Sequence, residues 1–309
     1  MRVMITGGTG LIGRALIEAL HEHDHQVLVL SRNPEKYDDF PYEVEFAQWD
    51  AETPRGWGEQ INHVDAVVNL AGENLAGKGF FPSPWTPERK QRILNSRLQA
   101  GQAINAAINA AKRKPKVLIQ ASAIGYYGPR GDDIITEESE PGDDFLAQTC
   151  VQWEHVTRPV EAMGVRRAII RTGIVLSTEE GALPRLLLPH RLFVGGPFGN
   201  GEQWYSWIHL ADEAAAIRFL IEHEQASGPF NLTAPHPLKN KVFSKTLGKV
   251  IERPSWLPIP GFVMRTLFGE VATVVLDGQR VLPQKLQALG FEFQYPTVEA
   301  ALRDLLADS

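Results

Sequence analysis

The stretch Gly7-Gly8-Thr9-Gly10-Leu11-Ile12-Gly13 decides the fold of this chain. It follows the short apolar run Val3-Met4-Ile5, and after it apolar residues recur at helical spacing over residues 11–23. A second apolar run, residues 27–30, comes next. The pattern predicts a buried strand, a tight glycine turn, a helix and a second strand.

The same alternation continues along the chain. Further apolar runs occupy residues 44–49, 66–70, 117–119 and 168–170, and helical patterns lie between them at residues 87–111 and 145–163. Strands that alternate with helices predict an α/β fold in which a doubly wound parallel sheet carries helices on both faces.

The pattern changes after residue 176, where glycine and proline become frequent between helical segments. We expect residues 1–176 to form the main domain and residues 177–309 a smaller, mostly helical C-terminal lobe. Two strand-like segments near residues 205–233, at residues 207–210 and 230–233, are expected to rejoin the sheet of the main domain.

The composition excludes several classes of protein. The 309 residues carry a formal net charge of −6, so the chain lacks the basic surface that nucleic-acid binding needs. No run approaches the roughly 18 apolar residues of a membrane span, and no signal peptide is recognised. A single cysteine is typical of a reducing compartment. We therefore expect a cytoplasmic protein with neither a nucleic-acid nor a membrane partner.

The glycine turn predicts dinucleotide binding. Glycines allow a tight turn and let a pyrophosphate approach the helix N-terminus, whose free N–H groups favour an anion. A plain strand-to-helix turn is the alternative, but the complete strand, helix and strand context favours a cofactor.

The end of the second strand predicts which cofactor is bound. An NAD site usually places Asp or Glu there, whereas this chain has Ser31-Arg32, and a guanidinium suits a 2′-phosphate. Arg14 is a second candidate for that phosphate. The residues therefore favour NADP(H), although Arg32 at the start of a solvated loop is the alternative interpretation.

Motifs spread over the whole chain indicate a family. The chain resembles the extended short-chain dehydrogenase/reductases, and more closely the epimerase-like YfcH family of atypical members. The resemblance implies a Rossmann-type, NADP-binding domain, a small C-terminal lobe and no defined substrate. The motifs are Asn69-Leu70-Ala71-Gly72-Glu73, Trp85-Thr86-Pro87-Glu88-Arg89, Ser96-Arg97, Gly125-Tyr126-Tyr127-Gly128, Arg171-Thr172-Gly173-Ile174-Val175-Leu176, Trp207-Ile208-His209 and Leu282-Pro283-Gln284-Lys285.

The resemblance also implies which residues bind the cofactor. The pyrophosphate is expected at Gly7, Gly10, Leu11, Ile12 and Gly13, and the 2′-phosphate at Ser31 and Arg32. The adenosine ribose is expected beside Leu70, Ala71 and Gly72. Arg97 is expected to face the phosphates, and Val175 to lie near the nicotinamide. Asp50 either contacts the adenine edge or ends a solvated strand. Extended relatives often dimerise through the helices beside the fourth and fifth strands, so a homodimer is expected.

The family's usual catalytic dyad is missing. Related enzymes use Tyr and Lys four residues apart on a helix, because a nearby cation makes the Tyr an effective base. Leu146 and Cys150 stand at the corresponding positions. Ser122 remains at its strand end as a candidate to bind a substrate oxygen. Tyr126 and Tyr127 are candidate acids or substrate-orienting groups, with packing over the cofactor as the alternative for at least one of them.

Several other residues have a structural interpretation that we favour over a functional one. Cys150 is a candidate nucleophile, but a lone cysteine on an apolar helix face is usually a core residue. His209 lies where relatives line the substrate cleft, yet a structural histidine is the preferred reading. His21 and His25 fit a zinc-protease pattern at a place where the first helix must end. Asn231 fits a glycosylation pattern that has no meaning without a secretory signal.

The sequence leaves more than one function open. The first hypothesis is an NADP(H)-dependent oxidoreductase or epimerase-like enzyme that acts on an unidentified small carbonyl or hydroxyl compound. The second is a non-catalytic protein that binds NADP(H) and senses its redox state. A hydrolase built on Ser122, His209 and Asp212 is disfavoured, because Ser122 lacks the flanking glycines of a nucleophile elbow.

Overall fold

The computed structural model describes residues 1–37, 40–77, 79 and 81–307. A parallel sheet of seven strands forms its centre, in the order β11-β7-β5-β4-β1-β2-β3. These strands are β1 (Arg2–Thr6), β2 (Gln26–Ser31), β3 (Glu45–Gln48), β4 (Ala66–Asn69), β5 (Val117–Ala123), β7 (Arg166–Thr172) and β11 (Gly228–Leu232). The order reverses direction at β1, so the doubly wound sheet predicted from the sequence is confirmed.

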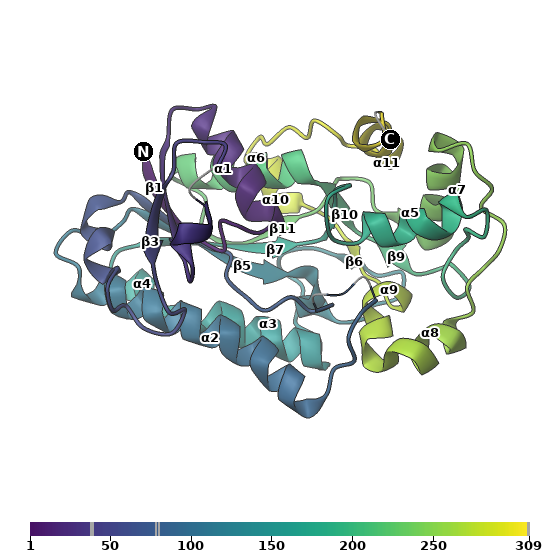
Figure 1. The fold of residues 1–309 in the computed structure, drawn as a ribbon, viewed down its shortest axis with the longest axis horizontal. Helices are drawn as coiled ribbons and strands as arrows, with labels where there is room; N and C mark the ends of the chain where they lie inside the picture. Colours follow the sequence, from purple (N-terminus) through teal and green to yellow (C-terminus); the bar gives the residue numbers. More distant parts are fainter. Residues whose placement is uncertain (38–39, 78, 80, 308–309) are drawn as a thin grey trace.

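Helices cover both faces of this sheet, as expected for parallel strands that are apolar on both sides (Figure 1). One face carries α1 (Leu11–His21), α6 (Leu210–Glu222) and α10 (Gln284–Ala288). The other face carries α2 (Pro87–Ala110), α3 (Phe145–Val156) and α4 (Pro159–Ala162). The single helical segment predicted over residues 145–163 is therefore wrong. Pro159 lacks the N–H that would continue the first helix, and the chain starts a new one there.

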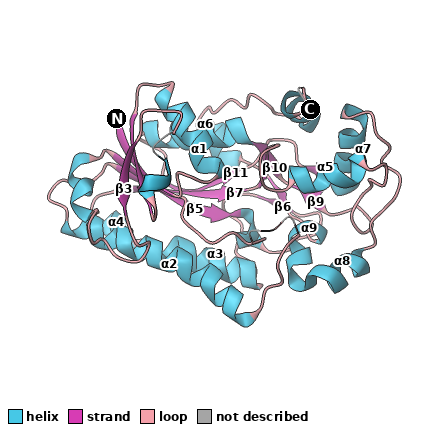
Figure 2. Cartoon of the chain, viewed as in Figure 1, coloured by secondary structure: helices cyan, strands magenta, loops and turns pink. Residues whose placement is uncertain are grey.

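The C-terminal lobe is mostly helical and lies beyond the carboxyl ends of the main strands (Figure 2). Its core is apolar, built around residues such as Leu183, Trp207, Phe243 and Leu302. Its helices are α5 (Leu183–Arg191), α7 (Asn240–Val250), α8 (Gly261–Phe268), α9 (Thr273–Leu276) and α11 (Val298–Leu305). Short 3-10 helices lie at Pro34–Tyr37, Gly58–His63, Ile124–Tyr127 and Gly269–Ala272.

Of three small two-stranded sheets, the first two connect this lobe to the main domain and the third lies within the lobe. They pair β6 (Ile134–Ile135) with β13 (Arg280–Val281), β8 (Ile174–Leu176) with β10 (Trp207–His209), and β9 (Trp204–Tyr205) with β12 (Leu238–Lys239). Of the two segments expected to rejoin the main sheet, the one at residues 230–233 does so, since residues 230–232 belong to β11 beside β7. The segment at residues 207–210 pairs with β8 instead.

The helices of the structure are short or polar relative to a bilayer span. Among the described residues, none is long and apolar enough to cross a membrane.

Candidate functional site

The glycine turn brings the N-terminus of α1 against the end of β4. Gly7 has φ +71°, and a Cβ there would lie 3.0 Å from the carbonyl of Leu70, so no side chain fits. A Cβ on Gly13 would lie 2.4 Å from the carbonyl oxygen of Gly7. The glycines therefore let strand, helix and neighbouring loop approach each other closely.

The first turn of α1 has the features of an anion site. Gly10 is its N-cap, no side chain caps the helix, and no acidic residue lies in the first turn. The backbone N–H groups at the start of α1, those of Leu11 and Ile12 among them, keep the hydrogen-bonding capacity and partial positive charge of an uncapped helix end. This cradle fits a pyrophosphate.

The end of β2 presents a hydroxyl and a cation. The Oγ of Ser31 accepts a hydrogen bond from the backbone N–H of Asn33 at 3.2 Å. The side chain of Arg32 is exposed at the strand end. Arg14, the second candidate for a 2′-phosphate, donates from Nε to the carbonyl of Thr9 at 3.0 Å and so braces the glycine turn.

Asp50 serves the turn after β3. Its carboxylate accepts hydrogen bonds from the N–H of Glu52 and from the N–H and hydroxyl of Thr53. These hydrogen bonds lower the pKa of Asp50 to about 2, and the bond from the Thr53 hydroxyl has the largest effect. In the structure Asp50 therefore stabilises a solvated turn at the end of β3, which was the alternative to a contact with adenine.

Polar side chains between the strand ends fix the loop after β4. The Thr6 hydroxyl donates to Asn69 Oδ1 at 2.7 Å and accepts from the N–H of Ala71 at 3.3 Å. Asn69 in turn donates to Gln120 Oε1 at 3.0 Å. All three side chains are buried, so this chain of bonds sets where Leu70 and Ala71 lie relative to the glycine turn.

Arg97 lies under the continuation of that loop. Its Nη1 donates to the carbonyls of Glu73 and Ile93 at 3.1 and 2.9 Å, and its guanidinium lies 4.6 Å from the ring centre of Trp153. A Cβ on Gly72 would lie 3.1 Å from the guanidinium carbon. The structure thus gives Arg97 a role in holding the loop at residues 72–73, and burial lowers its pKa.

Val175 reaches the same region from β8. A Cβ placed on Gly181 would lie 3.8 Å from the carbonyl oxygen of Val175 and 3.9 Å from Cδ2 of Leu11. The segment expected at the nicotinamide and the start of α1 are therefore near neighbours. The structure brings the residues expected around the cofactor to one edge of the sheet, where the carboxyl ends of its strands meet.

A buried charged cluster lies at that edge, centred on Glu154 of α3. Ser122 at the end of β5 donates its hydroxyl proton to Glu154 Oε1 at 2.7 Å. Arg171 at the end of β7 donates from Nε to Oε1 at 2.8 Å and from Nη2 to Oε2 at 2.9 Å. The bidentate pair is 4% exposed on the arginine side chain and 11% on the glutamate. Charge pairing and hydrogen bonds thus offset the desolvation of both groups.

Glu154 and Arg171 were not among the residues predicted for the site. One signal for them was present in the sequence: Arg171 directly follows the apolar run at residues 168–170, at a parallel-strand end where ligands bind. Glu154 lies one helical turn beyond Cys150, on the face of α3 that also carries Leu146. Glu154 and Arg171 are 17 residues apart, and no spacing in the sequence indicates that they form an ion pair.

The two tyrosines occupy different environments around Arg171. Its guanidinium lies 3.5 Å from the ring centre of Tyr126, which is partly exposed. Tyr127 is fully buried; its hydroxyl donates to Asn231 Oδ1 at 2.6 Å and accepts from Arg171 Nη1 at 2.9 Å. Burial raises the pKa of Tyr127 to about 12. The hydrogen bonds of Tyr127 are therefore used within the protein, whereas part of Tyr126 faces outward.

The positions of the usual dyad lie on α3 and carry no acid or base of the expected kind. Leu146 is apolar, and Cys150 is buried. Burial raises the pKa of the Cys150 thiol to about 11. A thiol that holds its proton at neutral pH is a poor nucleophile, in keeping with the core role preferred from the sequence.

The remaining histidine motifs are structural. His209 caps α6: its Nδ1 accepts from the N–H of Ala211 at 3.0 Å, and its Nε2 lies 3.2 Å from Asp304. Asp212 accepts from the N–H groups of Gln294 and Tyr295. Ser122, His209 and Asp212 thus have separate partners and do not form a triad.

The zinc-like pattern is interrupted by the end of a helix. His21 is the last residue of α1, and His25 beyond it lies 2.9 Å from Glu222 of α6. In the parts of the chain that the structure describes, no group of three or more His, Cys, Asp or Glu side chains is placed to hold a metal ion.

Comparison with known families agrees with this architecture. The model of the NAD dependent epimerase/dehydratase family matches residues 3–233, about three quarters of the chain. The chain belongs to this family. A second model, a domain of unknown function named DUF1731, matches residues 259–305 in the C-terminal lobe. The family resemblance inferred from the motifs is confirmed.

Individual relatives match this chain over nearly its whole length. The epimerase family protein YfhF of Bacillus subtilis is 41% identical, covering 100% of this chain and 99% of YfhF. The crystal structure of human epimerase family protein SDR39U1 (isoform 2) with NADPH has a TM-score of 0.88 and 32% identity, and covers 100% of both chains. A nucleoside-diphosphate sugar epimerase from Corynebacterium glutamicum has a TM-score of 0.77 and 34% identity over 99% of this chain and 58% of that one. This chain is thus an epimerase-like member of its family with a Rossmann-type domain and a helical C-terminal lobe.

Proposed function

We propose that this protein is an NADP(H)-dependent oxidoreductase or epimerase-like enzyme acting on a small hydroxyl or carbonyl compound. One observation carries the proposal: the uncapped start of α1 and the buried Ser122, Glu154 and Arg171 cluster lie at the same edge of the sheet. A cofactor on the first would reach the second. The human relative with NADPH supports the choice of cofactor.

The residues predicted for the cofactor fit this role. The glycine cradle and the helix amides would take the pyrophosphate, and Ser31 and Arg32 the 2′-phosphate that distinguishes NADP from NAD. Leu70, Ala71 and Val175 would border the rest of the molecule, with Arg97 and Gly72 beneath the loop. When bound, the nicotinamide supplies a hydride acceptor or donor.

Ser122 determines the kind of group that the site receives. A serine hydroxyl has one proton, and Ser122 gives it to Glu154. Ser122 therefore meets a substrate with its lone pairs and accepts a hydrogen bond from a substrate hydroxyl. If that hydroxyl lost its proton, the proton would move to the Ser122 oxygen, and at the same time Ser122 would give its own proton to the Glu154 carboxylate. Arg171 holds Glu154 in place, and the exposed part of Tyr126 is available to orient the substrate.

A non-catalytic redox sensor is the second candidate. Leu146 and Cys150 favour it, because they occupy the dyad positions without offering its chemistry. The two candidates share the cofactor site and differ in turnover. A screen of small alcohols and carbonyl compounds that follows NADPH absorbance would separate them, since a sensor binds cofactor and turns nothing over.

Calorimetric titration with NADPH and with NADH tests the proposal. We expect tight NADPH and weak NADH binding. Replacing Arg32 by Ala should weaken NADPH binding by about 10- to 100-fold, the loss of one charge-assisted bond, and leave NADH nearly unchanged. Lys112→Ala, an exposed cation beyond the end of α2, is the matched control. If neither nucleotide binds, both the enzyme and the sensor are excluded.

Two further parts of the proposal follow from the sequence. We place the protein in the cytoplasm, where the one cysteine, Cys150, stays a free thiol. We also propose a homodimer through α2 and α3, the helices beside β4 and β5. Sedimentation velocity checks the second point, and a species of 34.3 kDa at all concentrations would exclude it.

A further inference from the structure

Large apolar side chains gather on two loops of the C-terminal lobe. Leu192, Phe193 and Val194 follow α5 and are 62%, 54% and 44% exposed. Trp256 and Leu257 follow α7 and are 67% and 43% exposed. We call these five residues the two-loop patch. Contiguous exposed apolar surface on a protein marks a contact with another molecule, because it otherwise costs free energy in water.

Hydrogen bonds hold the two loops together. The N–H groups of Trp256 and Leu257 donate to the carbonyl of Gly195 at 3.0 and 3.1 Å. The indole Nε1 of Trp256 donates to the carbonyl of Phe193 at 3.1 Å. A Cβ on Gly196 would lie 2.1 Å from the carbonyl oxygen of Leu257. The five side chains therefore form one surface.

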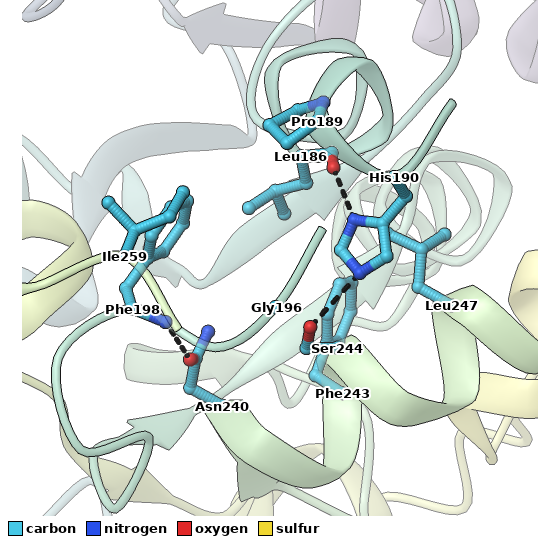
Figure 3. A pocket seen from close by; sticks show the side chains of 10 residues that line it. All are labelled: Leu186, Pro189, His190, Gly196, Phe198, Asn240, Phe243, Ser244, Leu247 and Ile259. Carbon is cyan, nitrogen blue, oxygen red and sulfur yellow. Dashed lines mark hydrogen bonds between the residues drawn. The ribbon is translucent and has the colours of Figure 1, made fainter. Parts of the chain in front are cut away.

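A buried polar connection joins the helices from which the two loops start, and Figure 3 shows its part between α5 and α7. His190 at the end of α5 lies 2.9 Å from the Leu186 carbonyl through Nδ1, which must carry the proton, and 3.0 Å from the Ser244 hydroxyl through Nε2. Ser244 of α7 is 2.8 Å from the hydroxyl of Ser255, next to Trp256. The cavity beside them is about 10 Å³, no more than a water molecule fills, so it is no ligand site. These bonds join α5, α7 and the second loop beneath the patch.

The backbone of both loops is held in an unfavourable conformation. Phe193 has φ +62° and Glu252 has φ +55°, in the left-handed region that bulky residues avoid. Both residues stand at the left-handed position that ends a helix, because the N–H of Val194 donates to the Pro189 carbonyl at 3.0 Å and that of Arg253 to the Gly248 carbonyl at 2.8 Å. The ends of α5 and α7 thus fix the backbone course where both loops begin.

The charges beside the patch indicate what covers it. Arg191 and Arg253 precede its two halves, and the Arg253 guanidinium lies 4.8 Å from the Phe193 ring centre. Neither guanidinium has an ion pair with a carboxylate in the described part of the chain, and Glu252 is the one acidic residue in these two segments. Arginine beside Trp, Phe and Leu matches a surface that is negatively charged outside and apolar beneath. If a second copy of the patch covered the first, the arginines of both copies would lie close together and their like charges would repel, so the charges disfavour this partner.

We propose that the two-loop patch docks the protein on the surface of an anionic lipid bilayer. The aromatic and aliphatic side chains enter the interface between headgroups and acyl chains, and the arginines contact the headgroups. The sequence predicted no membrane partner on the ground that no segment spans a bilayer. Docking at the surface needs no such segment and is independent of the cofactor site.

Co-sedimentation with vesicles tests this proposal. The probes are vesicles of equal parts phosphatidylcholine and phosphatidylglycerol, compared with pure phosphatidylcholine. We expect the protein to bind the mixed vesicles more tightly and added salt to weaken the binding. Trp256→Ser should lower the partition coefficient by about tenfold or more, as lost burial of a large aromatic side chain predicts.

Controls separate docking from general stickiness and from misfolding. Phe193→Ser keeps the hydrogen bond from Trp256 and should still weaken binding. Phe262→Ser removes an aromatic side chain that is 74% exposed on α8, outside the patch, and should change nothing. Circular dichroism and NADPH affinity of each variant report folding. Three results overturn the proposal: no binding of the wild type to either vesicle, equal losses from Phe262→Ser and Trp256→Ser, or a dimer that Trp256→Ser dissociates.

Discussion

Two glycines of the turn make different demands on the chain. A Cβ at Gly13 would lie 2.4 Å from a backbone oxygen, whereas one at Gly10 would lie 3.4 Å from the same atom. Gly13→Ala should therefore lower the free energy of unfolding by about 2 kcal/mol, as overpacking does, and Gly10→Ala should change it by less than about 0.5 kcal/mol. Urea unfolding measures both. Equal stabilities of the two variants would contradict the packing described for Gly13.

The Glu154 carboxylate is the counter-ion of a buried guanidinium. Glu154→Gln keeps the shape but leaves the Arg171 charge uncompensated, and should cost about 3 kcal/mol of stability. Ser122→Ala removes one hydrogen bond and leaves the ion pair intact, so a loss of about 1 kcal/mol is expected. Denaturant unfolding of both variants measures these losses, with far-ultraviolet circular dichroism as the check on the fold. A larger loss for Ser122→Ala than for Glu154→Gln would refute this order.

At the scale of elements, α6 carries a carboxyl group into the core. Glu213 is fully buried and accepts from the Thr172 hydroxyl at 2.7 Å, and burial raises its pKa from 4.5 to about 8. Between these values the folded protein holds a proton that the unfolded chain has lost. Stability should thus fall as pH rises from 4.5 to about 8, by at most about 1.4 kcal/mol per pH unit.

Removing this group should flatten the pH dependence. Glu213→Gln keeps an acceptor for Thr172 and cannot ionise, so it should gain stability relative to the wild type as pH rises from 6 to about 8. Thermal unfolding across this range measures the difference. Glu224→Gln, at an exposed position after α6, is the matched control. Parallel curves for the wild type and Glu213→Gln would show that Glu213 ionises normally.

At the scale of the whole molecule, the main domain depends on segments beyond residue 176. Residues of α6 such as Ile217 and Leu220 share a core with Ile17 and Leu20 of α1, and β11 completes the sheet beside β7. A fragment of residues 1–176 lacks α6 and β11 and should not unfold cooperatively. Near-ultraviolet circular dichroism and a urea titration of the fragment check this. A sharp transition together with NADPH binding would establish residues 1–176 as an independent domain.

Local patterns in the sequence predicted much of this architecture. The strand, turn and helix around Gly10 and the six main-sheet strands β1 to β5 and β7 followed from apolar periodicity and from the conformations that glycine allows. Such features depend on residues close together in the chain. The break before α4 was also present locally, in Pro159, but the apolar pattern on both sides of it concealed it.

By itself, the sequence determined the doubly wound sheet, the family and the glycine cradle at the start of α1, because periodicity and turn chemistry act over a few residues. Only the tertiary structure decided that β10 pairs with β8, that Glu154 binds both Ser122 and Arg171, and that two loops join into one exposed patch. These contacts connect segments far apart in the chain. Their partners are chosen by how helices and strands pack in space, and that leaves no spacing for a sequence pattern to show.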